Sequence, residues 1–350
     1  MSQQNEIQNS EIQPRKRLVS KNRIIVGVLI AIFYFAIIIF SHLTREHFAF
    51  IGSITDGRAI VSTMLSVVII LAIIEMRRAI GFEKIPHSMS WIVWAYAIAF
   101  GPSYYLFGYT GIIFMSLFVF AVASFNAIML NRPEIIMHVA FLLVYPGFLL
   151  SSLLYINKCA STQIISPDSP VYPYLTTDLW AQIHPSKTTY LLPYNSVGLA
   201  FVFVVSSFTD SFAMIFGKLF GKRKLCPLVS PKKTVEGAIG GLFGGLLGSL
   251  VVFLAYEVLA PNVAIIQQVI GLVLSFQGLR PSYLVLVYVS IGLVGSFMTQ
   301  VGDLLASITK RHFGIKDYSR ILGDHGGIMD RFDGIMLNAT FVALVYMFII

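Results

Sequence analysis

The chain has 350 residues, of which 56% are hydrophobic and only 12% are charged, and its formal net charge at pH 7 is +8. Its apolar residues come in runs of about 20, the length that crosses a bilayer as a helix. This composition excludes a soluble globular domain and predicts an all-α, polytopic integral membrane protein. No nucleic-acid partner is expected.

Hydropathy predicts about nine transmembrane helices. The first apolar run follows a basic stretch, as a signal peptide would, but it lacks a small-residue cleavage site and is interpreted as a retained helix. A shorter run, 263–276, is expected to lie along the interface or to re-enter the membrane. The predicted spans are 23–40, 59–76, 89–105, 110–130, 135–156, 193–216, 236–259, 282–306 and 334–350.

The distribution of Lys and Arg orients these helices. If the N-terminus is cytoplasmic, 20 of the 25 basic residues fall on the cytoplasmic side, as the positive-inside rule requires. The expected location is a bacterial cytoplasmic membrane, with both strongly charged loops in the cytoplasm. Cys159 and Cys226 then lie on opposite sides and cannot form a disulfide. We divide the chain into N-terminal helices with an extracytoplasmic loop, 1–192, and a C-terminal catalytic region, 193–350.

The first charged loop, Gly217 to Gly237, holds six cations and one acidic residue. Two hydroxyls flank two lysines, and the second hydroxyl is placed to cap a helix that begins at Val235, an arrangement suited to a triphosphate. The alternative is that the lysines contact anionic lipid headgroups. The residues concerned are Ser230, Lys232, Lys233 and Thr234.

Glycines recur after this loop in overlapping small-xxx-small repeats between Gly237 and Gly248. Such repeats are typical of a helix-packing face. We expect this face to be used within the chain or across a homodimer.

Two carboxylates, Asp210 and Asp303, fall well inside apolar helices, where a charge is costly and indicates a functional site. Asp210 lies seven residues before Gly217 and Asp303 lies seven before Lys310, so both are expected roughly 10 Å below the same surface, in one pocket. A structural pairing is the alternative. Glu75, at the end of a span, is expected to reach water.

The second charged loop, Ser307 to Gly334, combines five cations, two His and four carboxylates. Asp330 and Asp333 share one helical face if a helix starts nearby. These carboxylates would repel an anionic substrate unless a hard divalent cation lay between them. A solvated basic loop would explain the cations but not the carboxylates. The cations suited to phosphate are Lys310, Arg311 and Lys316.

This second loop resembles the C-terminal motif of the phosphatidate cytidylyltransferase family. The matching positions are Ser307, Lys310, Arg311, Lys316, Asp317, His325, Gly326, Gly327, Asp330, Arg331 and Asp333. The 230–237 stretch and the preceding Asp210 resemble a second block of the same family. The chain departs from the pattern at Thr309 and at Gly323-Asp324, which changes the turn before the His.

The resemblance implies that a cytidylyl group is transferred from CTP to phosphatidate, giving CDP-diacylglycerol and pyrophosphate in phospholipid biosynthesis. It implies magnesium as cofactor, with or without a second cation, held by Asp303 and Asp330. The catalytic residues that it implies are Asp303, Asp330, Asp333, His325, Lys310 and Arg311. The substrate-binding residues that it implies are Asp210, Ser230, Lys232, Lys233, Thr234, Lys316, Asp317 and Arg331.

Two other functions fit a polytopic protein with buried acids. A secondary transporter would bind its coupling ion at Asp210 and Asp303, but it predicts inverted repeats and charges at the midplane. A CDP-alcohol phosphotransferase needs clustered Asp and small residues in an order that is absent here.

Overall fold

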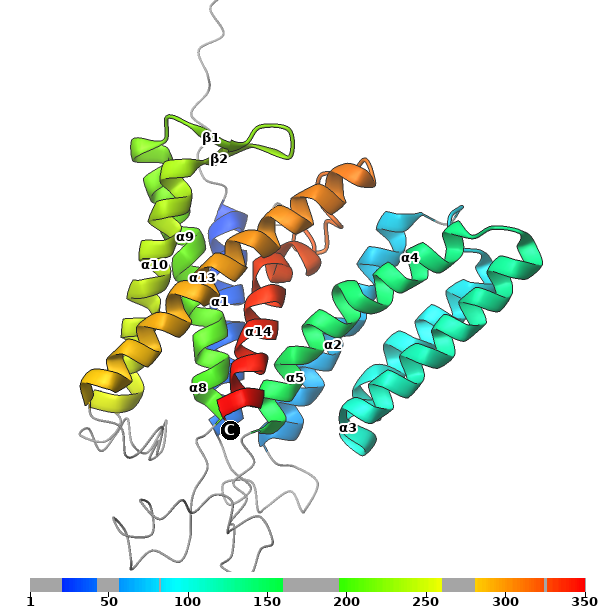
Figure 1. Ribbon diagram of the computed structural model, residues 1–350, viewed down its shortest axis with the longest axis horizontal. Helices are drawn as coiled ribbons and strands as arrows, with labels where there is room; N and C mark the ends of the chain where they lie inside the picture. The colour runs from blue at the N-terminus through cyan, green and yellow to red at the C-terminus, as the bar shows by residue number, and fades with distance from the viewer. Residues whose placement is uncertain are drawn as a thin grey trace, which may run out of the picture.

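The computed structural model describes residues 21–42, 57–81, 83–159, 195–259, 281–323 and 326–349. These residues are helical almost throughout, which confirms the predicted all-α membrane architecture (Figure 1). The helices are α1 (Lys21–His42), α2 (Gly57–Ile80), α3 (His87–Leu130), α4 (Glu134–Leu142), η2 (Leu143–Phe148), α5 (Leu149–Cys159), α8 (Asn195–Ala200), η3 (Phe201–Val205), α9 (Ser206–Phe220), α10 (Val235–Phe253), η4 (Leu254–Leu259), α13 (Pro281–His312) and α14 (Met329–Ile349).

Six helices in this described part are long and apolar enough to cross a membrane. They match six of the nine predicted spans, and the other three, 23–40, 89–105 and 334–350, fall on α1, the first half of α3 and α14. The apolar run 263–276 and most of the 157–192 loop lie outside the described residues. The six spans are 60–80, 106–130, 134–157, 197–220, 235–259 and 284–312.

The helix α3 is a helical hairpin rather than one rod. Gly108 has φ 62° and ψ −146°, a backbone conformation that breaks the helix and favours glycine. Beyond Gly108 the chain reverses its direction, as two contacts between the segments on either side of it show. The Tyr96 hydroxyl lies 3.1 Å from the Ser116 hydroxyl, and the Ser103 hydroxyl donates to the sulfur of Met115. The separate spans predicted on either side of Gly108 therefore form the two arms of this hairpin.

The glycine face of α10 packs inside the chain. Gly240 lies against Phe216 of α9, and Gly245 lies against Ser296 of α13, with no room for a Cβ atom at either position. The Ser296 hydroxyl donates to the carbonyl of Gly241 over 2.9 Å and accepts from Thr209 over 2.9 Å. Small residues let backbones approach and hydroxyls hydrogen-bond between helices in a membrane. Packing within the chain, one of the two expected uses of these glycines, is therefore observed.

The two helical groups meet at α14. In Figure 1, α9 and α10 lie on one side of it and α2 to α5 lie on the other, and α13 crosses it obliquely from the first side toward the second. α14 packs against α13 and α5. The N-terminal turn of α14 thus lies where both groups can contribute side chains.

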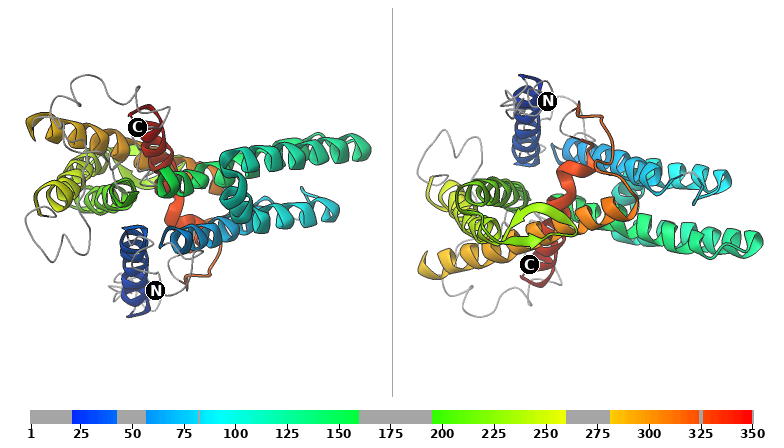
Figure 2. Two further views of the ribbon diagram at one scale, coloured as in Figure 1. Left: turned by 90° about the horizontal axis from the view of Figure 1, so that it is seen from below. Right: turned by 90° about the horizontal axis from the view of Figure 1, so that it is seen from above.

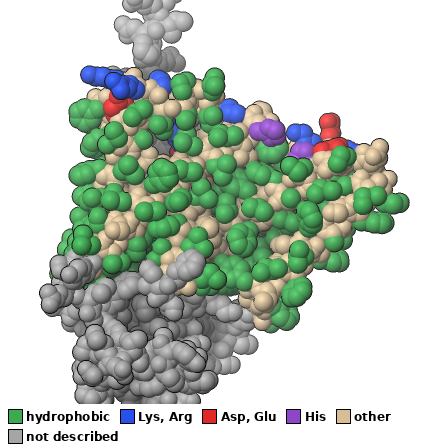
Figure 3. All heavy atoms as spheres, in the orientation of Figure 1, with side chains coloured by type: hydrophobic (Ala, Val, Ile, Leu, Met, Phe, Trp, Pro, Cys, Tyr) green, Lys and Arg blue, Asp and Glu red, His purple; other side chains and the backbone are tan. Residues whose placement is uncertain are grey.

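Charged side chains gather at one end of the bundle in Figure 3, which we name the charged end. It comprises the C-terminal turns of α13, the start of α14 and the loop between α9 and α10. This loop forms a two-stranded antiparallel hairpin, β1 (Lys224–Cys226) and β2 (Ser230–Thr234), whereas the sequence suggested no strand. Thr234 ends the hairpin and accepts a hydrogen bond from Gly237 N over 3.1 Å, which confirms it as the cap of α10.

Candidate active site

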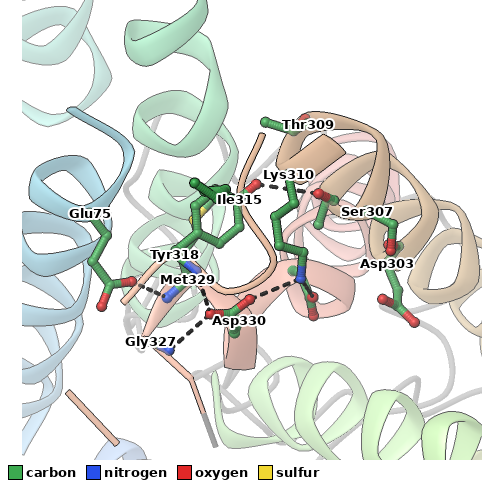
Figure 4. Close-up of polar contacts among 12 residues, drawn as sticks. Glu75, Asp303, Ser307, Thr309, Lys310, Ile315, Tyr318, Gly327, Met329 and Asp330 are labelled. Carbon is green, nitrogen blue, oxygen red and sulfur yellow. Dashed lines mark hydrogen bonds and ion pairs between the residues drawn. The ribbon is translucent and has the colours of Figure 1, made fainter. Parts of the chain in front are cut away.

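Asp330 is the most completely bonded carboxylate of the charged end. One oxygen accepts from Lys310 Nζ over 2.9 Å, and the other accepts from the backbone N–H groups of Tyr318 and Gly327, each over 2.9 Å (Figure 4). Gly326, with φ 80°, turns the chain so that the N–H of Gly327 faces this carboxylate. The Asp330 residue is only 8% exposed, and these three donors compensate the cost of burying its charge.

Lys310 connects the carboxylates of α14. Its Nζ lies 2.9 Å from Asp330 Oδ1 and 3.7 Å from Asp333 Oδ2. The ring of Tyr318 lies beneath the ammonium group, 5.5 Å from ring centroid to Nζ. Burial raises the pKa of the Tyr318 phenol above its ordinary value, so this ring stays neutral beside the lysine. The predicted shared helical face of Asp330 and Asp333 is thus occupied by an ammonium group.

Asp303 lies on α13 about two turns before Lys310, and it has its own lysine. In the view of Figure 4, Lys310 lies between Asp330 and Asp303. Lys233 of the hairpin reaches Asp303 with Nζ 2.6 Å from Oδ2. The hairpin and α13 are therefore tied together by an ion pair at the edge of a cavity.

This cavity, which we name the hairpin cavity, has a volume of about 460 Å³. Asp210 and Asp303 both line it, as their equal depth in the sequence predicted. Gly217 and Gly237 let α9 and α10 approach closely at its wall. The predicted nucleotide-binding residues that line it are Lys232, Lys233 and Thr234.

Other predicted site residues lie apart from the hairpin cavity. Three of them, Arg311, Lys316 and Asp317, are exposed at the end of α13 and in the following loop. Ser230 begins β2, and Arg331 lines a different cavity beside α1 and α2. His325 lies outside the described residues. The roles of these residues stay predictions.

Glu75 was not predicted as part of the site, and the expectation that it reaches water is wrong. It lies on α2 and is fully buried. One of its oxygens accepts from the Ser319 hydroxyl over 2.5 Å and from Ile328 N over 3.0 Å, and the other accepts from Met329 N over 2.8 Å. The loop between α13 and α14 folds over the end of α2, and the carboxylate caps the first turn of α14. Its sequence signal was weak: a single acid at the end of an apolar run.

A sequence profile of the cytidylyltransferase family matches residues 21–349 of the chain. The chain belongs to the cytidylyltransferase family. The resemblance drawn from the motif residues is thereby confirmed at the level of the family. In this cytidylyltransferase family member, the Lys310–Asp330 pair lies within the C-terminal motif, and the Lys233–Asp303 pair joins the 230–237 stretch to α13.

Named relatives match this family member over a short stretch. The phosphatidate cytidylyltransferase of Staphylococcus aureus strain COL is 52% identical over 50 residues, 14% of this chain and 19% of the relative. That of Staphylococcus saprophyticus is 56% identical over 46 residues, 13% of this chain and 18% of the relative. That of Staphylococcus epidermidis strain RP62A is 59% identical over 44 residues, 13% of this chain and 17% of the relative. Each match spans less than a fifth of the relative's length.

Proposed function

We propose that this protein is a phosphatidate cytidylyltransferase. An oxygen of the phosphatidate phosphate attacks the α-phosphorus of CTP, the bond from that phosphorus to the bridging oxygen breaks, and pyrophosphate leaves. The products are CDP-diacylglycerol and pyrophosphate. The observation that supports this most is the meeting, at one end of a membrane helix bundle, of two lysine–aspartate pairs and a cavity lined by lysine and aspartate side chains.

The hairpin cavity is the proposed nucleotide site. Lys232 and Lys233 line it together with Thr234 at the start of α10, so phosphate oxygens would meet two ammonium groups and the positive end of a helix. Lys233 is bound to Asp303 in the free protein. A triphosphate offers this lysine a second anionic partner within the same cavity.

The reaction needs no strong base from the protein. The attacking phosphate is already anionic at neutral pH, so catalysis consists of in-line positioning and of neutralising charge as it moves to the leaving pyrophosphate. Lys310, held between Asp330 and Asp333, supplies a positive charge with a fixed position. The hydrogen bonds from Tyr318 and Gly327 hold Asp330 in turn.

The carboxylates of this site fit a magnesium ion. When bound, such an ion would neutralise phosphate oxygens and polarise the bond that breaks. Asp303 and Asp330 are its proposed ligands, because magnesium commonly takes one or two carboxylates and completes its shell with phosphate oxygens and water. In the described part of the chain, no three His, Cys, Asp or Glu side chains converge. Ammonium groups 2.6 Å and 2.9 Å from Asp303 and Asp330 occupy positions that suit a cation.

The charged end is proposed to face the cytoplasm, where CTP is available. The excess of Lys and Arg in the loops of this end supports that orientation. A lipid phosphate at the membrane surface and a soluble nucleotide can then meet at one place.

A double-label assay tests the proposal. Purified protein in detergent is incubated with phosphatidate, magnesium and CTP labelled at either the α- or the γ-phosphorus. We expect the α-label in the lipid fraction and the γ-label in the aqueous fraction, with no transfer when phosphatidylcholine replaces phosphatidate. Absence of α-label from the lipid, with folded protein and magnesium present, would refute the function.

A further inference from the structure

A second cavity, which we name the lateral cavity, lies between α1, α2, the segment 321–323 and the start of α14. Its volume is about 850 Å³, within the range of roughly 300–1,000 Å³ that ligand pockets occupy. Both views of Figure 2 place α1 next to α2 and this segment. Its walls are almost entirely apolar, and the charged residue among the described residues that line it is Arg331.

The lateral cavity is open at the side of the bundle that a bilayer would cover. Leu29 of α1 and Val67 of α2 both line it, and they are 57% and 49% exposed. Phe332 and Ile328 line the part next to the start of α14. A molecule in this cavity is therefore reached from the lipid phase and contacts the first turn of α14.

Arg331 has unused hydrogen-bonding capacity at this place. Its Nε is buried and has no hydrogen-bond partner among the described residues. The backbone carbonyl of Arg331 accepts from the Tyr34 hydroxyl over 3.1 Å, which fixes α1 against α14. Arg331 follows Asp330 in the first turn of α14, so its backbone is next to that aspartate while its side chain lines the apolar cavity.

We propose that the lateral cavity holds an acyl chain of the phosphatidate substrate and that Arg331 binds its phosphate. The inference rests on the proposed function and adds the position of the lipid. Lipid tails are as apolar as the cavity walls, so the walls align a chain without selecting it. Selection comes from the guanidinium, which matches phosphate with paired, charge-assisted hydrogen bonds. Together they place a lipid phosphate next to the first turn of α14.

A matched pair of variants on α1 tests the apolar part. Leu29 lines the lateral cavity and Ile32 does not, yet the two side chains are 57% and 58% exposed on one helix. Leu29→Trp should raise the apparent KM for long-chain phosphatidate by about tenfold and leave the KM for CTP unchanged. Ile32→Trp should change neither. Val67→Trp, from the α2 wall, repeats the test if Leu29→Trp does not fold.

A photoactivatable phosphatidate with its reactive group on the acyl chain tests binding without turnover. The wild-type protein should be labelled on α1 and α2, unlabelled phosphatidate should compete, and phosphatidylcholine should compete at least about tenfold less well. Arg331→Gln should remove this preference, and Arg331→Lys should restore only part of it. Equal competition by both lipids, or equal effects of the two α1 tryptophans, means that the cavity holds bulk lipid and overturns the inference.

These outcomes remain separable from failure of the proposed function. Labelling needs no CTP. A wild-type protein that labels selectively but makes no CDP-diacylglycerol would refute the transferase and leave the phosphate-lipid site standing. A protein that makes CDP-diacylglycerol without selective labelling would support the transferase and refute the phosphate-lipid site.

Discussion

Glu75 offers the sharpest test of how the charged end is held together. Its carboxylate accepts from one hydroxyl and two backbone N–H groups, all in the loop before α14 or in the first turn of that helix. In Glu75→Gln one oxygen becomes an amide NH₂. In the more favourable orientation of this amide, its oxygen still accepts from Ser319 and Ile328. Its NH₂ then faces the N–H of Met329, so the Met329 donor loses its acceptor.

The expected cost follows from these bonds. A hydrogen bond to a charged group contributes roughly 1.5–3 kcal/mol, and a buried donor left without an acceptor costs roughly 1–3 kcal/mol. Loss of the Met329 bond and weakening of the other two should therefore favour opening of the loop by about 3 kcal/mol. Since about 1.4 kcal/mol corresponds to a factor of ten, the open fraction rises about 100-fold.

Hydrogen exchange measures this opening directly. Amides of residues 326–332 should exchange about 100-fold faster in Glu75→Gln if they exchange through opening of this loop, and kcat should fall because Asp330 receives its Gly327 and Tyr318 bonds from the same loop. Glu83→Gln is the matched control, because Glu83 is exposed just after α2. Unchanged protection of these amides together with unchanged kcat would show that Glu75 does not hold the loop.

Three further outcomes follow from the proposed chemistry. Asp303→Asn and Asp330→Asn should each lower kcat at least ~100-fold, comparable to removing a group that stabilises transition-state charge, and added magnesium should recover part of the loss. Changing Lys232 and Lys233 together to Gln should raise the KM for CTP, or lower kcat, even in neutral detergent. An impermeant thiol reagent applied to intact cells should leave Cys226 unlabelled until the membrane is opened, because the hairpin is proposed to be cytoplasmic.

Each of these has a control within the chain. Asp324→Asn should cost less than about tenfold, since the family resemblance gives that position no ligand role and Asp is a common turn residue. Changes at Lys222 and Arg223 should matter mainly with anionic lipid. Near-normal, magnesium-dependent turnover in the Asp303 or Asp330 variant would make that carboxylate structural. Labelling of Cys226 from outside would reverse the proposed orientation.

The sequence predicted those features of the site that depend on one element at a time. Hydropathy located the helices, because a bilayer requires long apolar segments that satisfy their own backbone hydrogen bonds. Thr234 was predicted to cap α10 because a cap depends on residues within one turn. The shared depth of Asp210 and Asp303 followed from the helix rise alone, and both line the hairpin cavity.

The remaining features depend on contacts between distant segments. Glu75 lies 253 residues from Ile328, and an acid at the end of an apolar run is locally indistinguishable from one in water. Helix periodicity turns Arg331 away from Asp333, but it does not reveal that α1 lies on that side. The ammonium partners of Asp303 and Asp330 likewise come from other elements. Tertiary packing, rather than any local pattern, decides these positions.

The glycine face of α10 implies that the protein responds unevenly to removal from its native lipid. Contacts of α10 with α9 and α13 rest on close van der Waals approach and on hydroxyl hydrogen bonds, as at Gly245 and Ser296, and not on exclusion of water. The α3 hairpin instead exposes large apolar side chains such as Phe114 and Ile128, and its surroundings are lipid. A change of lipid acyl length or of surfactant should therefore disturb the two arms of the α3 hairpin first, while α9, α10 and α13, which line the hairpin cavity, keep their arrangement.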